Sequence, residues 1–126
     1  MTTTQRILLF KPKFIEPVRA GTKLQTIRPT RRFPITVGDK LSLRHWKDRP
    51  YASPQVLIRE AHCTRTGPVR ISHDWVVVDH RLLTAPEIIE FAKADGFEHP
   101  QQMIEEFATM HGLPFSGVLI QWGANV

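Results

Sequence analysis

The stretch Gly21-Thr22-Lys23-Leu24-Gln25-Thr26-Ile27-Arg28 places an amine, a hydroxyl and a guanidinium within six positions of one another. Gly21 has the permissive backbone that allows a short helix to end. The following residues are predicted to form a strand whose side chains alternate between two faces, so Thr26 and Arg28 share a face. Lys23 lies at the bend before this strand, where its long side chain can turn back toward the Thr26 hydroxyl. These residue types in this order predict a binding or catalytic site.

Several short strands are predicted on both sides of this stretch. A brief helix over 16–20 has Pro17 in its first turn and Gly21 after its end. Gly67 and Pro68 are predicted to turn the chain, because both residues commonly interrupt strands. The predicted strands, recognised by β-branched and alternating apolar residues, cover 6–11, 25–28, 40–46, 55–64, 69–72, 75–79 and 117–122.

Two helices are predicted late in the chain. Thr84-Ala85-Pro86-Glu87 has the form of a capping box, which predicts a helix from about Ala85 to Ala94. A second helix over 100–111 carries apolar residues at helical spacing, and this stripe is predicted to belong to the core. A run of strands followed by a helix pair predicts an α+β protein with a mostly antiparallel barrel or sandwich.

Five segments, in chain order, resemble the ASCH domain family, whose members share a PUA-like β-barrel. The resemblance covers nearly the whole chain and implies a single domain over residues 1–126. It also implies a mostly antiparallel barrel of five or six strands with flanking short helices. The segments are the apolar helix 14–20, the Gly-x-Lys-x-x-Thr-Ile-Arg stretch 21–28, the turn and strand 37–43, Ala94-Asp95-Gly96-Phe97, and the last strand 117–122.

The bacterial family members that this chain resembles are amidohydrolases that remove the acetyl group from N(4)-acetylcytidine with a Lys, a Thr and a downstream Glu. The resemblance implies that Lys23 and Thr26 take the first two catalytic positions and that Asp95, one methylene shorter than Glu, takes the third. A threonine hydroxyl needs a base, and a lysine can be that base when burial or a neighbouring cation keeps part of it neutral. Arg28 is such a cation and is also a candidate substrate-binding residue. The chain departs from those compact enzymes by extra residues between Trp46 and Leu83.

The charge is unevenly divided along the chain. Residues 1–70 hold fifteen Lys or Arg against four Asp or Glu, whereas residues 71–126 hold two against eight. A basic cluster of this kind is the expected footprint of a phosphate backbone, although a solvated basic face has the same composition. Trp46 and Tyr51 flank basic residues and are candidates for base stacking. The predicted nucleic-acid-binding residues are Arg31, Arg32, Arg44, Lys47 and Arg49.

Other functions and roles stay open. The chain can bind RNA or a modified nucleoside without turnover, or cleave RNA with Lys and Arg stabilising the phosphoryl transition state. A protein-interaction module is a further alternative. For single residues, Thr26 can be an ordinary strand threonine, Lys23 a phosphate contact, and Asp95 a turn residue before Gly96.

Other classes of protein are excluded by composition. The single cysteine, Cys63, allows no internal disulfide, and neither it nor the six histidines show the spacing of a metal site. No cofactor is expected. The chain has no apolar run long enough for a membrane span or a signal peptide, so a cytoplasmic protein is predicted.

Overall fold

The computed structural model describes residues 5–123, which form one mostly antiparallel sheet of seven strands and three α-helices. The α+β class predicted from the sequence is confirmed, and the sheet has seven strands, whereas the resemblance implied a barrel of five or six. The strands are β1 (Gln5–Leu9), β2 (Gln25–Arg28), β3 (Lys40–Trp46), β4 (Gln55–Ile71), β5 (Val76–Val78), β6 (Arg81–Leu82) and β7 (Phe115–Trp122). The helices are α1 (Ile15–Ala20), α2 (Ala85–Ala94) and α3 (Pro100–His111), and a 3-10 helix covers Pro12–Phe14.

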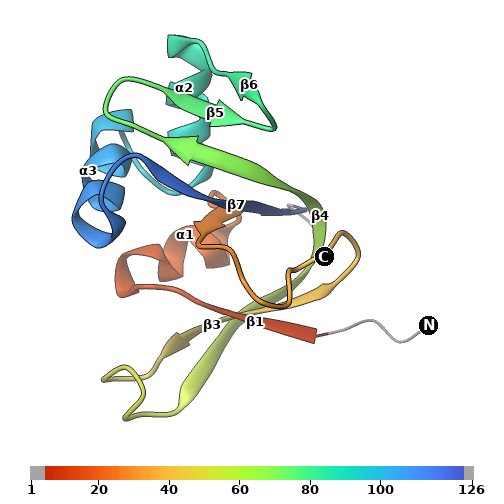
Figure 1. The fold of residues 1–126 in the computed structure, drawn as a ribbon. Coiled ribbons are helices and arrows are strands. Elements are labelled where there is room, and N and C mark those ends of the chain that lie inside the picture. The colour runs from red at the N-terminus through yellow and green to blue at the C-terminus, as the bar shows by residue number, and fades with distance from the viewer. Residues whose placement is uncertain (1–4, 124–126) are drawn as a thin grey trace.

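The long strand β4 joins two halves of the sheet (Figure 1). Its first part pairs antiparallel with β3, which pairs in parallel with β1. Its second part lies between β7 and β5, and β7 in turn pairs with β2. In Figure 1, helices α2 and α3 lie beside the second half, and the tip of the β3–β4 hairpin points away from them.

Strand pairing does not close the sheet into a barrel. Within residues 5–123, β1 and β2 each pair with a single strand and leave one edge open. Pro29 follows β2 directly and cannot donate a ladder hydrogen bond, so β2 stays only four residues long. Instead of a ladder, one side chain connects the two edges, because Arg28 Nη2 donates to the Leu9 carbonyl over 2.7 Å.

The predicted turn at Gly67 and Pro68 is wrong, because β4 runs straight through both residues. Gly67 pairs with Leu119 and Pro68 with Val118 of β7, so tertiary pairing overrides the local turn preference. A Cβ on Gly67 would overlap the Asp79 carboxylate, which approaches the strand here. Glycine in this strand therefore makes room for a neighbouring side chain.

The predicted helix ends are confirmed. Gly21 ends α1 with a left-handed φ of 80°. Thr84 caps α2 through the predicted reciprocal bonds with Glu87. Trp122 is buried, whereas Trp75 is half-buried. Within residues 5–123, no helix combines the length and apolar character that crossing a membrane requires.

Candidate functional site

A pocket of about 240 Å³ lies where the end of β1, strand β2 and the two late helices meet. Its walls are mainly apolar and include Phe10, Phe14 and Phe97. The four residues predicted from the sequence as catalytic or substrate-binding, namely Lys23, Thr26, Arg28 and Asp95, all line this pocket. Tertiary structure therefore brings Asp95 to the residues of the first motif.

The bend that holds Lys23 is fixed by backbone hydrogen bonds to three elements. The Thr22 and Lys23 amides both donate to the Pro17 carbonyl of α1, each over 3.0 Å. The Leu24 amide donates to the Ala94 carbonyl at the end of α2 over 3.1 Å, and the Leu24 carbonyl accepts from Trp122 of β7 over 3.0 Å. The bond to Ala94 brings the bend beside Asp95, the next residue of the chain.

Thr26 and Arg28 lie on the same face of strand β2, as the alternation of side chains along a strand predicted, and both line the pocket. Arg28 Nε donates to Thr26 Oγ1 over 3.0 Å, and the guanidinium carbon lies 5.0 Å from the centre of the Phe10 ring. A guanidinium that donates to a hydroxyl oxygen stabilises negative charge on that oxygen and leaves the hydroxyl proton free to bond a base. The arrangement therefore favours deprotonation of Thr26.

Lys23 and Asp95 form a buried pair. Their side chains are 2% and 4% exposed, and Lys23 Nζ lies 3.6 Å from Asp95 Oδ1. The same ammonium nitrogen donates to the Asp95 main-chain carbonyl and lies 4.4 Å from the centre of the Phe14 ring. Lys23 is thus bonded to Asp95, and Thr26 to Arg28, so proton transfer between Lys23 and Thr26 requires the amine to turn away from Asp95.

Gln25 is a buried partner that the sequence analysis did not select. Its Nε2 lies 3.5 Å from Asp95 Oδ1, and its Oε1 accepts from Gln121 over 3.1 Å. Alternation along β2 turns this side chain away from the face of Thr26, and a single glutamine gave no signal of a site. Gln25 and Lys23 therefore approach the same oxygen of the Asp95 carboxyl.

Burial shifts the pKa of both amine and guanidinium in this pocket. Desolvation lowers the pKa of Lys23 below its usual 10.5, Asp95 opposes this change, and the Arg28 charge adds to it. Desolvation also lowers the pKa of Arg28 to about 10. A larger neutral fraction of Lys23 near pH 7 is what a lysine base requires.

Burial acts in the opposite sense on the acid. Desolvation raises the pKa of Asp95 from 3.8 to about 6, and the charge of Lys23 and the hydrogen bond from Gln25 only partly offset it. Both members of the pair are therefore pushed toward their neutral forms. Strongly shifted acids and bases in a cleft are typical of functional sites.

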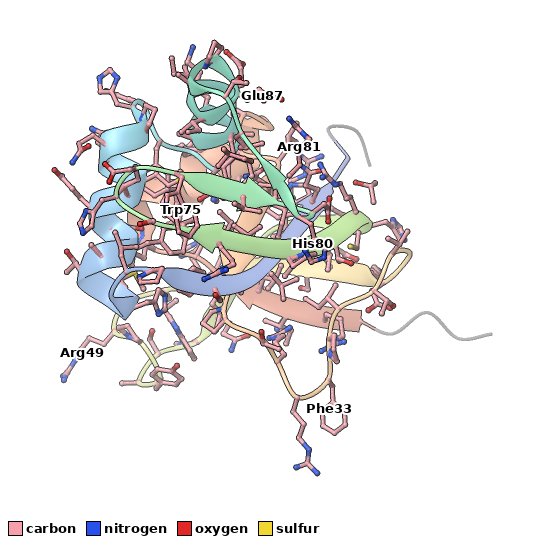
Figure 2. All side chains as sticks on the ribbon, turned by 45° about the horizontal axis from the view of Figure 1, so that its top comes forward. Phe33, Arg49, Trp75, His80, Arg81 and Glu87 are labelled. Carbon is pink, nitrogen blue, oxygen red and sulfur yellow. The ribbon has the colours of Figure 1, made fainter. Side chains whose placement is uncertain are left out.

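The residues predicted to bind nucleic acid lie outside this pocket and on separate segments. Arg31 and Arg32 are exposed in the loop between β2 and β3, and Lys47 and Arg49 are exposed in the loop between β3 and β4. Arg44 is half-buried in β3 and donates to Ser42 Oγ over 2.7 Å. Figure 2 shows Arg49 and Phe33, which follows Arg32, projecting from two different loops.

Other pocket residues were missed by the sequence analysis. Phe10 and Lys11 enter from the end of β1, and Glu106 enters from α3, where it lies 3.8 Å from Lys11 Nζ. Met110, predicted as core, lines the pocket and is 51% exposed. No motif in the sequence indicated that the residues just after β1 face a site.

Among the described residues, no group of three or more His, Cys, Asp or Glu side chains is placed to hold a metal ion. Searches of protein-family models, curated proteins and solved structures find no match to this chain. The chemistry of the pocket must therefore be argued from its own residues.

Proposed function

We propose that this chain is a PUA-like protein of the ASCH type that binds an RNA-derived nucleoside and hydrolyses its N-acyl group, with N(4)-acetylcytidine as the model substrate. The proposal takes up the family resemblance of the sequence. The open edges of β1 and β2, connected by Arg28, lie where a further pairing would complete a barrel. An RNA-derived substrate also fits the cytoplasmic location expected from the sequence.

One observation carries the proposal: a single small pocket holds both a buried lysine of lowered pKa and a threonine hydroxyl bonded by a guanidinium. These are the base and the activated nucleophile that acyl transfer needs. The pocket volume of about 240 Å³ is below the range of about 300–1,000 Å³ that holds drug-sized ligands. This space fits a single base that carries a small acyl group.

The reaction proceeds in two acyl-transfer steps. Thr26 Oγ1 attacks the acyl carbon while its proton passes to neutral Lys23, and the electron pair of the carbonyl bond moves onto the acyl oxygen. Arg28 Nε, which donates to Thr26 Oγ1, stabilises the negative charge on that hydroxyl oxygen as the proton leaves. The bond from the acyl carbon to the base nitrogen then breaks, and that nitrogen takes the proton from Lys23. Water attacks the resulting threonine ester and gives a proton to Lys23. Lys23 passes this proton to Thr26 Oγ1 as the ester bond breaks, so the carboxylic acid, the free Thr26 hydroxyl and neutral Lys23 are released.

Asp95 acts as a positioning residue in this scheme. It holds the Lys23 amine at the pocket wall until substrate enters. Turning the amine toward Thr26 leaves the carboxyl with Gln25 as its partner. Burial, which raises the pKa of Asp95 to about 6, favours transfer of the Lys23 ammonium proton to this carboxyl, which leaves the amine neutral.

The test incubates purified protein with N(4)-acetylcytidine and follows release of cytidine and acetate by chromatography. Thr26→Val retains the shape of the side chain and removes the hydroxyl, so it should reduce turnover by several orders of magnitude. Lys23→Met should do the same, and the double variant should be little worse than either single variant because the two groups act as a unit.

Thr66→Val is the matched control. Thr66 of β4 and Thr26 of β2 both pair with Ile120 of β7, from its two sides, but only Thr26 lines the pocket. The control should keep full turnover. Undiminished turnover in Thr26→Val would refute covalent catalysis by this residue, and absence of turnover in the parent protein would leave RNA binding or RNA cleavage as the alternatives.

A further inference from the structure

A second hollow of about 300 Å³ adjoins the candidate site. The end of β1, from Leu9 to Lys11, lines both hollows and separates them. The far wall of the second hollow is formed by Trp46 and Tyr51, at the tip of the β3–β4 hairpin. A ligand that fills the first pocket can therefore continue over β1 into the second.

An exposed ring, Tyr51, and a half-buried ring, Trp46, lie together beside the site. Their centres lie 5.1 Å apart with an angle of 48° between the planes. Tyr51 is 90% exposed, which leaves nearly the whole ring to solvent, and its φ of 61° is unusual for a bulky residue. Residues held in such conformations concentrate at ligand-binding sites.

The hairpin tip is held in shape by its own hydrogen bonds. The Lys47 amide donates to the Pro54 carbonyl over 2.9 Å. The Asp48 amide donates to Ser53 Oγ over 3.0 Å, and that hydroxyl donates to the Arg49 carbonyl over 2.8 Å. A loop fixed before binding loses less conformational entropy when a ligand docks.

Charge around the hollow favours an anionic ligand. Lys11 lines both hollows, and Lys47 and Arg49 are exposed in the hairpin tip on either side of Asp48. Lys11 and Asp48 are the charged residues that line the hollow, and the two further cations of the hairpin tip give its surroundings a net positive charge. Stacking rings within a cationic surface are how proteins hold the bases and phosphates of single strands.

We propose that this second hollow binds the base next to the acylated nucleotide, stacked on Tyr51 and Trp46, so that the substrate is a single-stranded RNA. The inference rests on the proposed function, since it takes the first pocket as the place of the modified base. Lys11 is placed to contact the phosphate that joins the two nucleotides, because it lines both hollows.

The test measures binding of a fluorescein-labelled six-nucleotide single-stranded RNA by anisotropy. Tyr51→Gly removes the ring and suits the positive φ of this position. Loss of one stacked base should raise the Kd about tenfold. Tyr51→Phe should restore the affinity to within about twofold of the parent protein. The control, Leu82→Ala, removes an apolar side chain that is 63% exposed on β6 and should leave the Kd unchanged.

Hydrolysis of free N(4)-acetylcytidine is measured on the same proteins and should be equal in the parent and in Tyr51→Gly. An RNA affinity that does not change in Tyr51→Gly, or an absence of RNA binding in the parent protein, overturns the inference even when the free nucleoside is hydrolysed. RNA binding that depends on Tyr51 without hydrolysis of the nucleoside supports the second subsite and refutes the proposed reaction instead.

Discussion

The Lys23 amine lies 3.6 Å from the Asp95 carboxylate, although 72 positions separate the two residues in the chain and both are buried. This pair joins the bend before β2 to the end of α2. Its burial also explains why the pKa of the amine is lowered and the pKa of the acid is raised. Stability and activity should therefore depend on the same two groups.

We expect the two partners to be coupled in stability. At pH 8, Lys23→Met leaves the Asp95 carboxylate buried without its cation, and losing one partner of a buried ion pair costs about 3–5 kcal/mol. The double variant Lys23→Met/Asp95→Asn carries no buried charge at either position. Its loss in the free energy of unfolding should be smaller than the sum of the losses in the two single variants. Urea denaturation of the parent, the two single variants and the double variant measures these free energies as a double-mutant cycle. Additive losses in the free energy of unfolding would contradict the pairing.

The stability contribution of Asp95 should fall as pH rises from about 4 to 6. The folded protein holds the Asp95 proton up to a pKa of about 6, whereas the unfolded chain releases it near 3.8. Across this interval the folded state binds more protons, so the free energy of unfolding decreases with rising pH. The decrease should be on the order of 3 kcal/mol relative to Asp95→Asn. An increase over this range in urea titrations of the two proteins would refute the raised pKa.

The pH profile of hydrolysis should identify Lys23 as the base. Neutral Lys23 is the active form, so kcat/KM should rise with pH through a pKa below 10.5. Arg28→Met removes a positive charge that lowers this pKa, and the rising limb should move to higher pH as the rate falls. The exposed neighbour Arg31→Met is the control and should keep the parent profile. If Arg28→Met loses rate but the rising limb of its pH profile does not move, Arg28 has a structural role only.

The approach of β7 to β2 should be sensitive to one methyl group. A Cβ on Gly117 would lie 2.5 Å from the Arg28 carbonyl oxygen and 2.6 Å from the Phe115 ring. Gly117→Ala should therefore destabilise the protein by about 1–3 kcal/mol and displace Arg28 from Thr26. Ser116→Ala, at the exposed neighbouring position, should change neither the thermal unfolding temperature nor the turnover. A fully active, fully stable Gly117→Ala would contradict the close packing.

Binding of single-stranded RNA should weaken as salt concentration rises. Each phosphate contact contributes a slope of about −0.7 to the plot of log affinity against log salt. Arg31→Ala, Arg32→Ala, Lys47→Ala and Arg49→Ala should each make the slope shallower by about that amount without changing hydrolysis of the free nucleoside. Lys93 is an exposed residue of α2, so Lys93→Ala is the control and should keep the parent slope. A flat salt dependence in the parent would indicate a nucleoside-sized ligand.

Local features of the sequence were sufficient to predict the helices and the first part of the site. The capping box at Thr84 and the left-handed Gly21 act through bonds to residues only a few positions away, so the sequence pattern contains both partners. Alternation along β2 likewise places Thr26 and Arg28 on one face without reference to any other strand. Asp95 was selected from the family resemblance, and no spacing rule relates it to Lys23.

Long-range pairing decided the rest. Gly67 and Pro68 have strong turn preferences, yet β7 supplies their pairing partners, and the free energy of the ladder outweighs the local preference. The opening between β1 and β2 and the entry of Phe10 and Lys11 into the pocket depend on how strands distant in sequence meet. By itself the sequence determined which groups are available for chemistry. Only the tertiary structure decided which of them are buried together, because desolvation and pairing are set by neighbours that the chain brings from far away.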